Sequence, residues 1–226
     1  MSAAPPHRWA ATITGLIIAL VVPALATTFS VDPLNEDDSS TKAILLNEAG
    51  IWLLALVILA IVRFWEKQPL ASIGLVPPTR SAILFGAKVV LALVALAVIA
   101  GLAVQSTGLP MPEQPAELVI SLPVWIQLLV ALSAGFTEEI LFRGYAIERM
   151  TELTGSRWIG ALLPVFVFGA AHASFWGLAH AIVAGLTGLW LSLLYLWRRN
   201  LWTNITAHAL LDGLVFLVVD AATAAG

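Results

Sequence analysis

Two adjacent glutamates, Glu138 and Glu139, stand inside an apolar stretch of the chain. Glu139 and Arg143 are four residues apart, so on a helix they share a face, where the guanidinium can neutralise the carboxylate. Glu138 is turned about 100° from that face and lacks such a local partner. One acid is then held as an ion pair, while the other is available to take a proton from water as a general base.

Histidines in two later apolar stretches add to this polar set. Phe168 and His172 are spaced to share a helix face, and His208 and Asp212 repeat that spacing. Measured from the expected cytoplasmic helix ends, Glu138 and these polar groups lie very roughly 10–21 Å deep. An ionised group at the bilayer centre costs at least about 2.5–3.5 kcal/mol, so such groups mark functional sites. The pattern favours one polar site built from three helices, with an interhelical polar clamp as the alternative.

The same side chains allow other chemistry. Intramembrane Glu and His form proton relays in transporters, although the chain shows no inverted repeat that would support transport. A zinc site is a further alternative, because nitrogen and oxygen ligands could come from Glu139, His172, His208 and Asp212. We rank zinc lower, since there is no His-Glu-x-x-His segment and Arg143 would repel a cation. We expect no cofactor, and the absence of Cys excludes thiolate chemistry.

Membrane helices must position these groups, because the composition is that of a membrane protein. The chain is 60% hydrophobic and 11% charged, whereas soluble domains are nearer half apolar and a quarter charged. Between Arg157 and Arg198 lie forty residues without Asp, Glu, Lys or Arg, enough for two crossings. We therefore expect an all-α polytopic membrane protein with about seven transmembrane helices, in the range six to eight. The expected spans are about 9–29, 43–63, 81–104, 122–148, 158–173, 178–197 and 201–219.

Basic residues predict the orientation. Eight of them fall on the side of the N-terminus: Arg8, Arg63, Lys67, Arg80, Arg149, Arg157, Arg198 and Arg199. Lys42 alone falls on the other side, with Asp37, Asp38 and other acids. This bias predicts a multi-pass protein of the cell membrane with a cytoplasmic N-terminus. Lys88 lies about 10 Å inside its span, where its long stem can snorkel to the interface.

The chain divides by function rather than into separate folding units. Residues 1–121 are expected to hold three N-terminal membrane helices and their loops, and residues 122–220 the polar site within the same membrane domain. Ala24-Leu25-Ala26 also resembles a signal-peptidase site, but the preceding apolar run is long for a signal peptide. We favour a retained first span. With a net charge of −3 and no basic tail, nucleic acid is not an expected partner.

Three motifs stand in order on three expected spans: Glu138-Glu139-x-x-x-Arg143, Phe168-x-x-x-His172 and His208-x-x-x-Asp212. They resemble the motifs of the CPBP family of intramembrane proteases, which includes the CAAX prenyl endopeptidases and the bacterial Abi proteins. The likeness covers about residues 122–216, and the segment 69–75 is similar to one that many members carry before their third span.

The resemblance implies an intramembrane endopeptidase with a glutamate-activated water. By position, Glu138 and His172 match the water-activating pair, and His208 with Asp212 match the residues that hold the oxyanion. Glu139 and Arg143 match the supporting part of the first motif. The expected partners are the lipid bilayer and a membrane-associated peptide or protein substrate, which in CAAX processing is prenylated. A non-catalytic scaffold or immunity protein of the same family is the alternative.

One position departs from the best-studied members, which carry Asn where this chain has Asp212. An ionised aspartate only accepts hydrogen bonds, whereas the Asn amide also donates. Asp212 would therefore either donate as a protonated acid or orient His208 as the donor.

Overall fold

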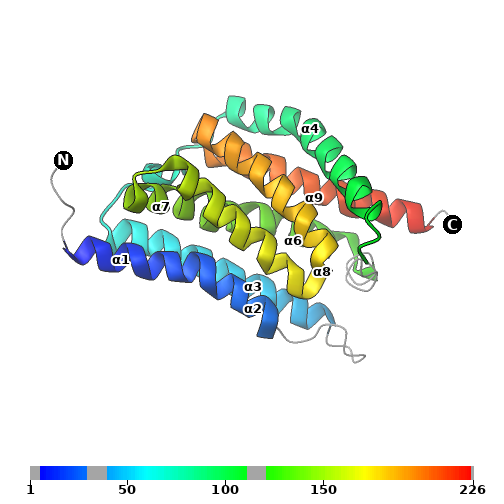
Figure 1. Ribbon diagram of the computed structural model, residues 1–226, viewed down its shortest axis with the longest axis horizontal. Helices are drawn as coiled ribbons and strands as arrows, with labels where there is room; N and C mark the ends of the chain where they lie inside the picture. Colours follow the sequence, from blue (N-terminus) through cyan, green and yellow to red (C-terminus); the bar gives the residue numbers. More distant parts are fainter. Residues whose placement is uncertain (1–5, 30–39, 111–120, 225–226) are drawn as a thin grey trace.

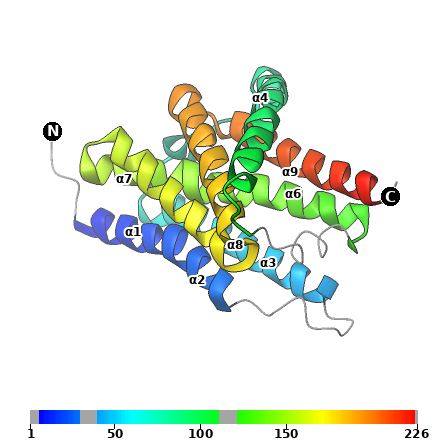
Figure 2. The same ribbon diagram turned by 45° about the vertical axis from the view of Figure 1, so that its right-hand side comes forward.

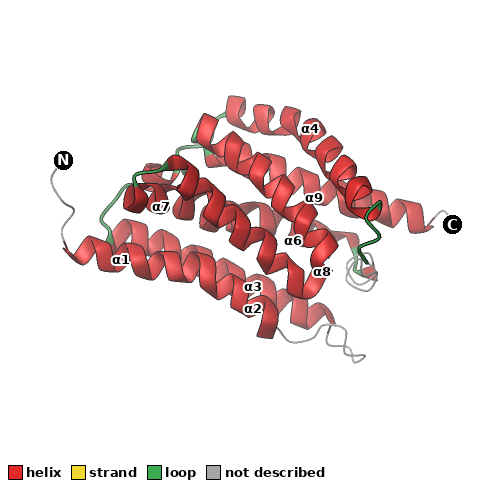
Figure 3. Ribbon diagram, viewed as in Figure 1, coloured by secondary structure: helices red, strands yellow, loops and turns green. Residues whose placement is uncertain are grey.

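The protein is a bundle of helices in a computed structural model that describes residues 6–29, 40–110 and 121–224 (Figures 1 and 3). The described residues contain helices and connecting loops but no strand, which confirms the predicted all-α class. The N-terminal elements are α1 (Pro6–Leu16), η1 (Ile17–Val21), α2 (Val22–Phe29), α3 (Ser40–Ala60), η2 (Ile61–Trp65), η3 (Leu70–Ile73) and α4 (Arg80–Gln105). They are followed by α6 (Val124–Glu138), η4 (Glu139–Ala146), α7 (Ile147–Thr154), α8 (Arg157–Arg198) and α9 (Leu201–Ala224).

Six segments of the described chain are long and apolar enough to cross a membrane. They are Arg8–Leu25, Thr41–Trp65, Arg80–Gln105, Val124–Thr154, Trp176–Arg198 and Leu201–Val218. Large apolar side chains such as Phe64, Leu91 and Phe166 are about three-quarters exposed. Exposure of so much apolar surface to water would be energetically unfavourable, so we infer that the bilayer covers it.

The helix α8 is two antiparallel helices joined at Gly177. The φ of 81° and ψ of 166° at this residue are not helical, and the positive φ suits glycine. The ribbon of α8 turns back on itself in both views (Figures 1 and 2). A Cβ on Gly169 would lie 3.1 Å from the Ala181 carbonyl oxygen and 3.3 Å from the Gly185 Cα. The two halves therefore pack backbone against backbone, as small residues allow in membranes. This hairpin occupies the residues of the expected fifth and sixth spans, but only its second half, Trp176–Arg198, is among the six segments above. Six candidates lie at the lower end of the expected range of six to eight.

The helix that carries both glutamates is longer than expected and is not uniformly α-helical. It continues through α6, η4 and α7 to Gly155, which ends it with a φ of 69°. The expected end near residue 148 was therefore too early, because the polar residues that follow are stabilised by tertiary contacts. Residues 139–146 form a π-helix, a form that is rare and frequent at functional sites.

The two helices that carry the glutamates and His208 approach closely. A Cβ on Gly135 of α6 would lie 2.7 Å from the Cβ of Ala209 on α9. Any larger residue at Gly135 would push these helices apart. A Cβ on Gly188 of α8 would likewise meet Phe168 at 2.8 Å and Arg143 at 3.0 Å. Two glycines thus let three helices close around the polar site.

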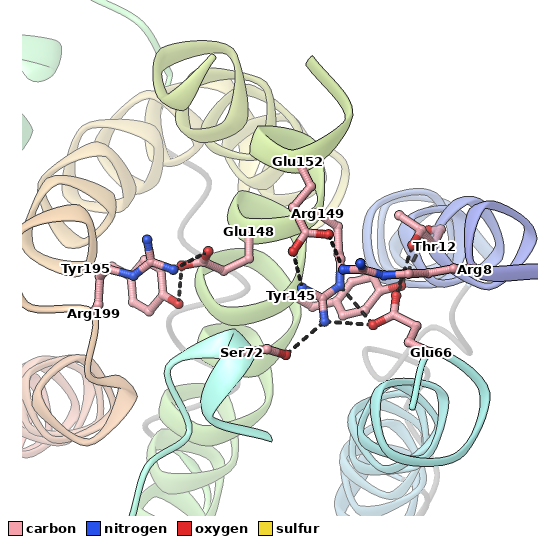
Figure 4. A network of polar contacts seen from close by, with 10 residues as sticks. All are labelled: Arg8, Thr12, Glu66, Ser72, Tyr145, Glu148, Arg149, Glu152, Tyr195 and Arg199. Carbon is pink, nitrogen blue, oxygen red and sulfur yellow. Dashed lines mark hydrogen bonds and ion pairs between the residues drawn. The ribbon is translucent and has the colours of Figure 1, made fainter. Parts of the chain in front are cut away.

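A buried polar network ties the helices together at the end of the bundle where the basic residues gather (Figure 4). Arg149 is fully buried and contacts Glu66 of the α3–η3 connection at 2.7 Å. It also donates to Ser72 at 3.0 Å, while Tyr145 donates to Glu66 at 2.8 Å. A second cluster joins Glu148 to Tyr195 at 2.9 Å and to Arg199 at 2.6 Å.

Two of the basic residues counted for the orientation take part in this network. Arg149 and Arg199 each pair with a glutamate, and Arg149 lies inside α7. The acids Asp37 and Asp38 on the opposite side lie outside the described residues. The segment 69–75 belongs to this end of the bundle, where the Leu201 N–H donates to the Gly74 carbonyl at 2.9 Å. That contact fixes the start of α9.

Candidate active site

Glu139 and Arg143 form the ion pair that their spacing predicted. Arg143 Nη1 lies 2.9 Å from Glu139 Oε1, and the two side chains are 1% and 0% exposed. Arg143 also donates to the Gly188 carbonyl at 3.3 Å, and its guanidinium carbon lies 4.3 Å from the Phe168 ring centre. The π-helical turn does not break the pair. Glu139 is therefore committed to structure and has no access to water.

His208 is surrounded by three carboxyl groups. Its Nδ1 lies 2.9 Å from Glu139 Oε1, and its Nε2 lies 3.7 Å from Glu138 and 3.5 Å from Asp212. Because the Glu139 carboxylate paired with Arg143 can only accept, Nδ1 must carry the proton of this contact. Glu139 thus fixes the tautomer and directs Nε2 toward Glu138 and Asp212.

His172 joins the site through Phe168. Its Nδ1 lies 2.7 Å from the Phe168 carbonyl oxygen, which can only accept, so Nδ1 is the donor. The neutral ring then presents a free electron pair on Nε2. Phe168 lies between the two histidines, with ring centres 4.6 Å from His172 and 6.4 Å from His208.

The carboxyl groups of this cluster differ in how far their side chains are exposed. The side chains of Glu138 and Asp212 are 23% and 26% exposed, while that of Glu139 is fully buried. Glu138 is therefore the glutamate that the surrounding protein does not enclose. The structure brings together all six residues named from the sequence: Glu138, Glu139, Arg143, His172, His208 and Asp212. Their catalytic roles stay a prediction.

Asn204 is a member of the cluster that sequence reasoning missed. Its Nδ2 donates to Glu139 Oε2 at 3.1 Å and to the Leu191 carbonyl at 2.8 Å, and the side chain is fully buried. Asn204, His208 and Asp212 repeat every four residues on α9, so all three share a face. An amide inside an apolar span, one turn before His208, was the signal that could have found it.

We expect Asn204→Leu to destabilise the protein by about 1.5–3 kcal/mol, because a buried charged acceptor loses a hydrogen bond. Asn204→Asp should be worse, since it places a second carboxylate beside buried Glu139. Thermal unfolding in detergent measures the stability of both variants. Equal stability of Asn204→Leu and wild type would show that the contact between Asn204 and Glu139 does not stabilise the protein.

The arrangement fits zinc poorly. Both oxygens of Glu139 are engaged, by Arg143, His208 and Asn204, and the guanidinium lies where it would repel a cation. Among the described residues, no three His, Asp or Glu side chains are grouped in a way that could hold a metal ion.

A comparison with protein families finds a match over the part of the chain that contains these residues. Residues 120–214, which are 95 of the 226, match the family described as type II CAAX prenyl endopeptidase Rce1-like. No curated protein and no solved structure matches the chain. The matched segment begins just before α6 and contains all three motifs and the whole polar cluster. Residues 120–214 are therefore similar to the type II CAAX prenyl endopeptidases, and the match supports a CAAX-type protease in this part of the chain.

Proposed function

We propose that the protein is an endopeptidase that cleaves a peptide bond of a membrane-associated protein or peptide with a water activated by Glu138. The observation that carries this proposal is the division between the two glutamates. Glu139 is buried and bound by three partners, whereas Glu138 is partly exposed and lies 3.7 Å from His208. A general base needs such access to water together with a fixed position.

The proposed reaction follows from these positions. Glu138 accepts a proton from water, and the resulting hydroxide forms a bond to the carbonyl carbon of the substrate. The charge that develops on the carbonyl oxygen is stabilised by N–H donors, of which protonated His208 Nε2 is the best placed. When the peptide C–N bond breaks, Glu138 returns its proton to the leaving amine, so that the enzyme ends unchanged. His172, whose Nε2 is free in the neutral ring, helps to hold the water.

Asp212 acts through His208 in this proposal. Its carboxyl oxygen lies 3.5 Å from His208 Nε2 on the next turn of α9. An ionised Asp212 would favour the protonated ring and so supply the donor that an Asn supplies directly in other family members. This role accounts for the departure at position 212 without a change of mechanism.

The substrate is expected to be a membrane-associated chain, and prenylation is part of the proposal because the matching family is described as prenyl endopeptidase. Comparing membrane peptides from cells with wild type and with Glu138→Gln tests the proposal. Fragments that depend on Glu138 support an endopeptidase, and cleavage next to a prenylated cysteine would support CAAX processing. Identical peptide sets would favour the non-catalytic scaffold, while Glu138-dependent proton flux in liposomes would favour transport.

We also propose that the N-terminus is cytoplasmic and that the protein lies in the cell membrane. The reason is the excess of basic residues at one end of the bundle. Single cysteines at positions 38 and 157 test this, because the chain has no native Cys. Position 157 should react with an impermeant thiol reagent only when the cytoplasmic face is open, and position 38 only from outside. The reverse pattern would invert the orientation.

A further inference from the structure

Basic side chains gather where the start of α4 lies beside the end of α8. Arg80 and Lys88 line an open depression of about 420 Å³, together with Ser81, Leu84 and Phe85. Arg198, the last residue of α8, extends over the Phe85 ring, with its guanidinium carbon 4.7 Å from the ring centre. Three cations therefore border one depression, at the end of the bundle where the basic residues gather.

These cations lack carboxylate partners. None of the three forms an ion pair within the described part of the chain, and all are exposed. By contrast, Arg143, Arg149 and Arg199 are each held by a glutamate. A cluster of unneutralised cations attracts an anion from outside the chain.

Lys88 makes an anion at this place especially favourable. It lies eight residues into α4, about 12 Å along the helix from Arg80. A cation facing lipid at such depth is costly unless it reaches the interface or meets a counter-charge. Lys88 and Arg80 line the same depression, so a counter-charge placed there would lie beside both.

An apolar groove continues from the basic depression. A second depression of about 230 Å³ lies between α4 and α8 and is lined by Val89, Trp190, Leu193, Leu194 and Trp197. The rings of Phe85 and Trp197, one from each depression, are in edge contact with centres 5.7 Å apart. Trp190 lies seven residues before Trp197, so the groove extends about 10 Å along the helix. A free inorganic anion would not cover this apolar surface, whereas an acyl chain would.

We propose that the seam between α4 and α8 binds an anionic phospholipid. The phosphate lies among Arg80, Lys88 and Arg198, and one acyl chain lies along the groove from Trp197 to Trp190. Basic pockets between membrane helices on the cytoplasmic side are suited to anionic head groups, and the apolar groove adds selectivity for a lipid over a soluble phosphate. No residue of this site belongs to the Glu138 cluster, so the proposal is independent of the proteolytic one.

Native mass spectrometry of the detergent-purified full chain tests the head-group contacts. Phosphatidylglycerol should be retained at least about tenfold better than phosphatidylcholine, and the Arg80→Gln, Lys88→Gln double variant should lose that preference. The matched control is Arg63→Gln with Lys67→Gln, which removes two exposed cations outside the depression. Equal retention of the two lipids, or an equal loss in the control, would overturn the proposal.

Quenching of tryptophan fluorescence tests the acyl chain. Phosphatidylglycerol with dibrominated chains should quench wild type more than Trp190→Phe, because Trp190 lies in the groove. Inorganic phosphate at the same concentration should not displace the lipid. Full displacement of the lipid by phosphate would show a site for a soluble anion. Identical quenching of both proteins would show that no acyl chain lies beside Trp190. Either result would refute the assignment.

Discussion

Replacing Glu138 with glutamine is expected to lower kcat by about 10²–10⁴-fold, the usual contribution of a general base. The amide keeps the shape of the side chain but cannot accept a proton from water. Stability should be nearly unchanged, because Glu138 is partly exposed and its contact with His208 is long at 3.7 Å. Turnover of a peptide found in the membrane-peptide comparison, together with thermal unfolding in detergent, measures both quantities.

Asp212→Asn is the matched control for this experiment. Asp212 faces the same nitrogen of His208, at 3.5 Å, and has nearly the same exposure as Glu138. The substitution removes the same charge but introduces the residue that the best-studied proteases of the similar family carry at this position. It should therefore keep most of the activity that Glu138→Gln loses. If Glu138→Gln turned over substrate as fast as wild type, the proposed base would be wrong.

Replacing Glu139 with glutamine is expected to destabilise the protein by about 3–5 kcal/mol, because it leaves Arg143 as an uncompensated buried charge. Arg143 is 1% exposed in the folded protein, so it cannot escape by snorkelling to the interface. The Gly188 carbonyl at 3.3 Å and the Phe168 ring at 4.3 Å offset only part of the loss. Activity should also fall, since Glu139 fixes the tautomer of His208.

Denaturation in mixed micelles, compared between variants, measures this free energy of unfolding. Glu152→Gln is the control, because Glu152 also pairs with an arginine but is 41% exposed, where a pair contributes about 0–1 kcal/mol. Removing both charges of the buried pair, as Glu139→Gln with Arg143→Met, should recover part of the stability. A stability of Glu139→Gln equal to wild type would contradict the assigned structural role.

Local contacts were predictable because they depend on helix geometry alone. The Glu139–Arg143 pair follows from a spacing of four residues and survives even in a π-helical turn. The hairpin of α8 follows from an uncharged stretch twice as long as the bilayer requires, interrupted by Gly177.

Long-range contacts were not predictable, because nothing in a single sequence encodes the register between two helices. His208 and Asn204 contact Glu139 although they lie 69 and 65 residues away in the sequence. Both contacts depend on the close approach of α6 and α9 at Gly135. The pair of Arg149 with Glu66, which lies 83 residues earlier, was likewise not predicted.

The amino-acid sequence by itself determined that this is a membrane protein with helical spans and which side chains carry its chemistry, since burying charge in a bilayer is costly wherever it occurs. It could not assign the partners that those side chains find on other helices. Only the tertiary structure decided that Glu139 is enclosed by Arg143, His208 and Asn204 while Glu138 stays partly exposed. The physical reason is that exposure depends on how α6, α8 and α9 pack, whereas the cost of a buried charge depends on residue type.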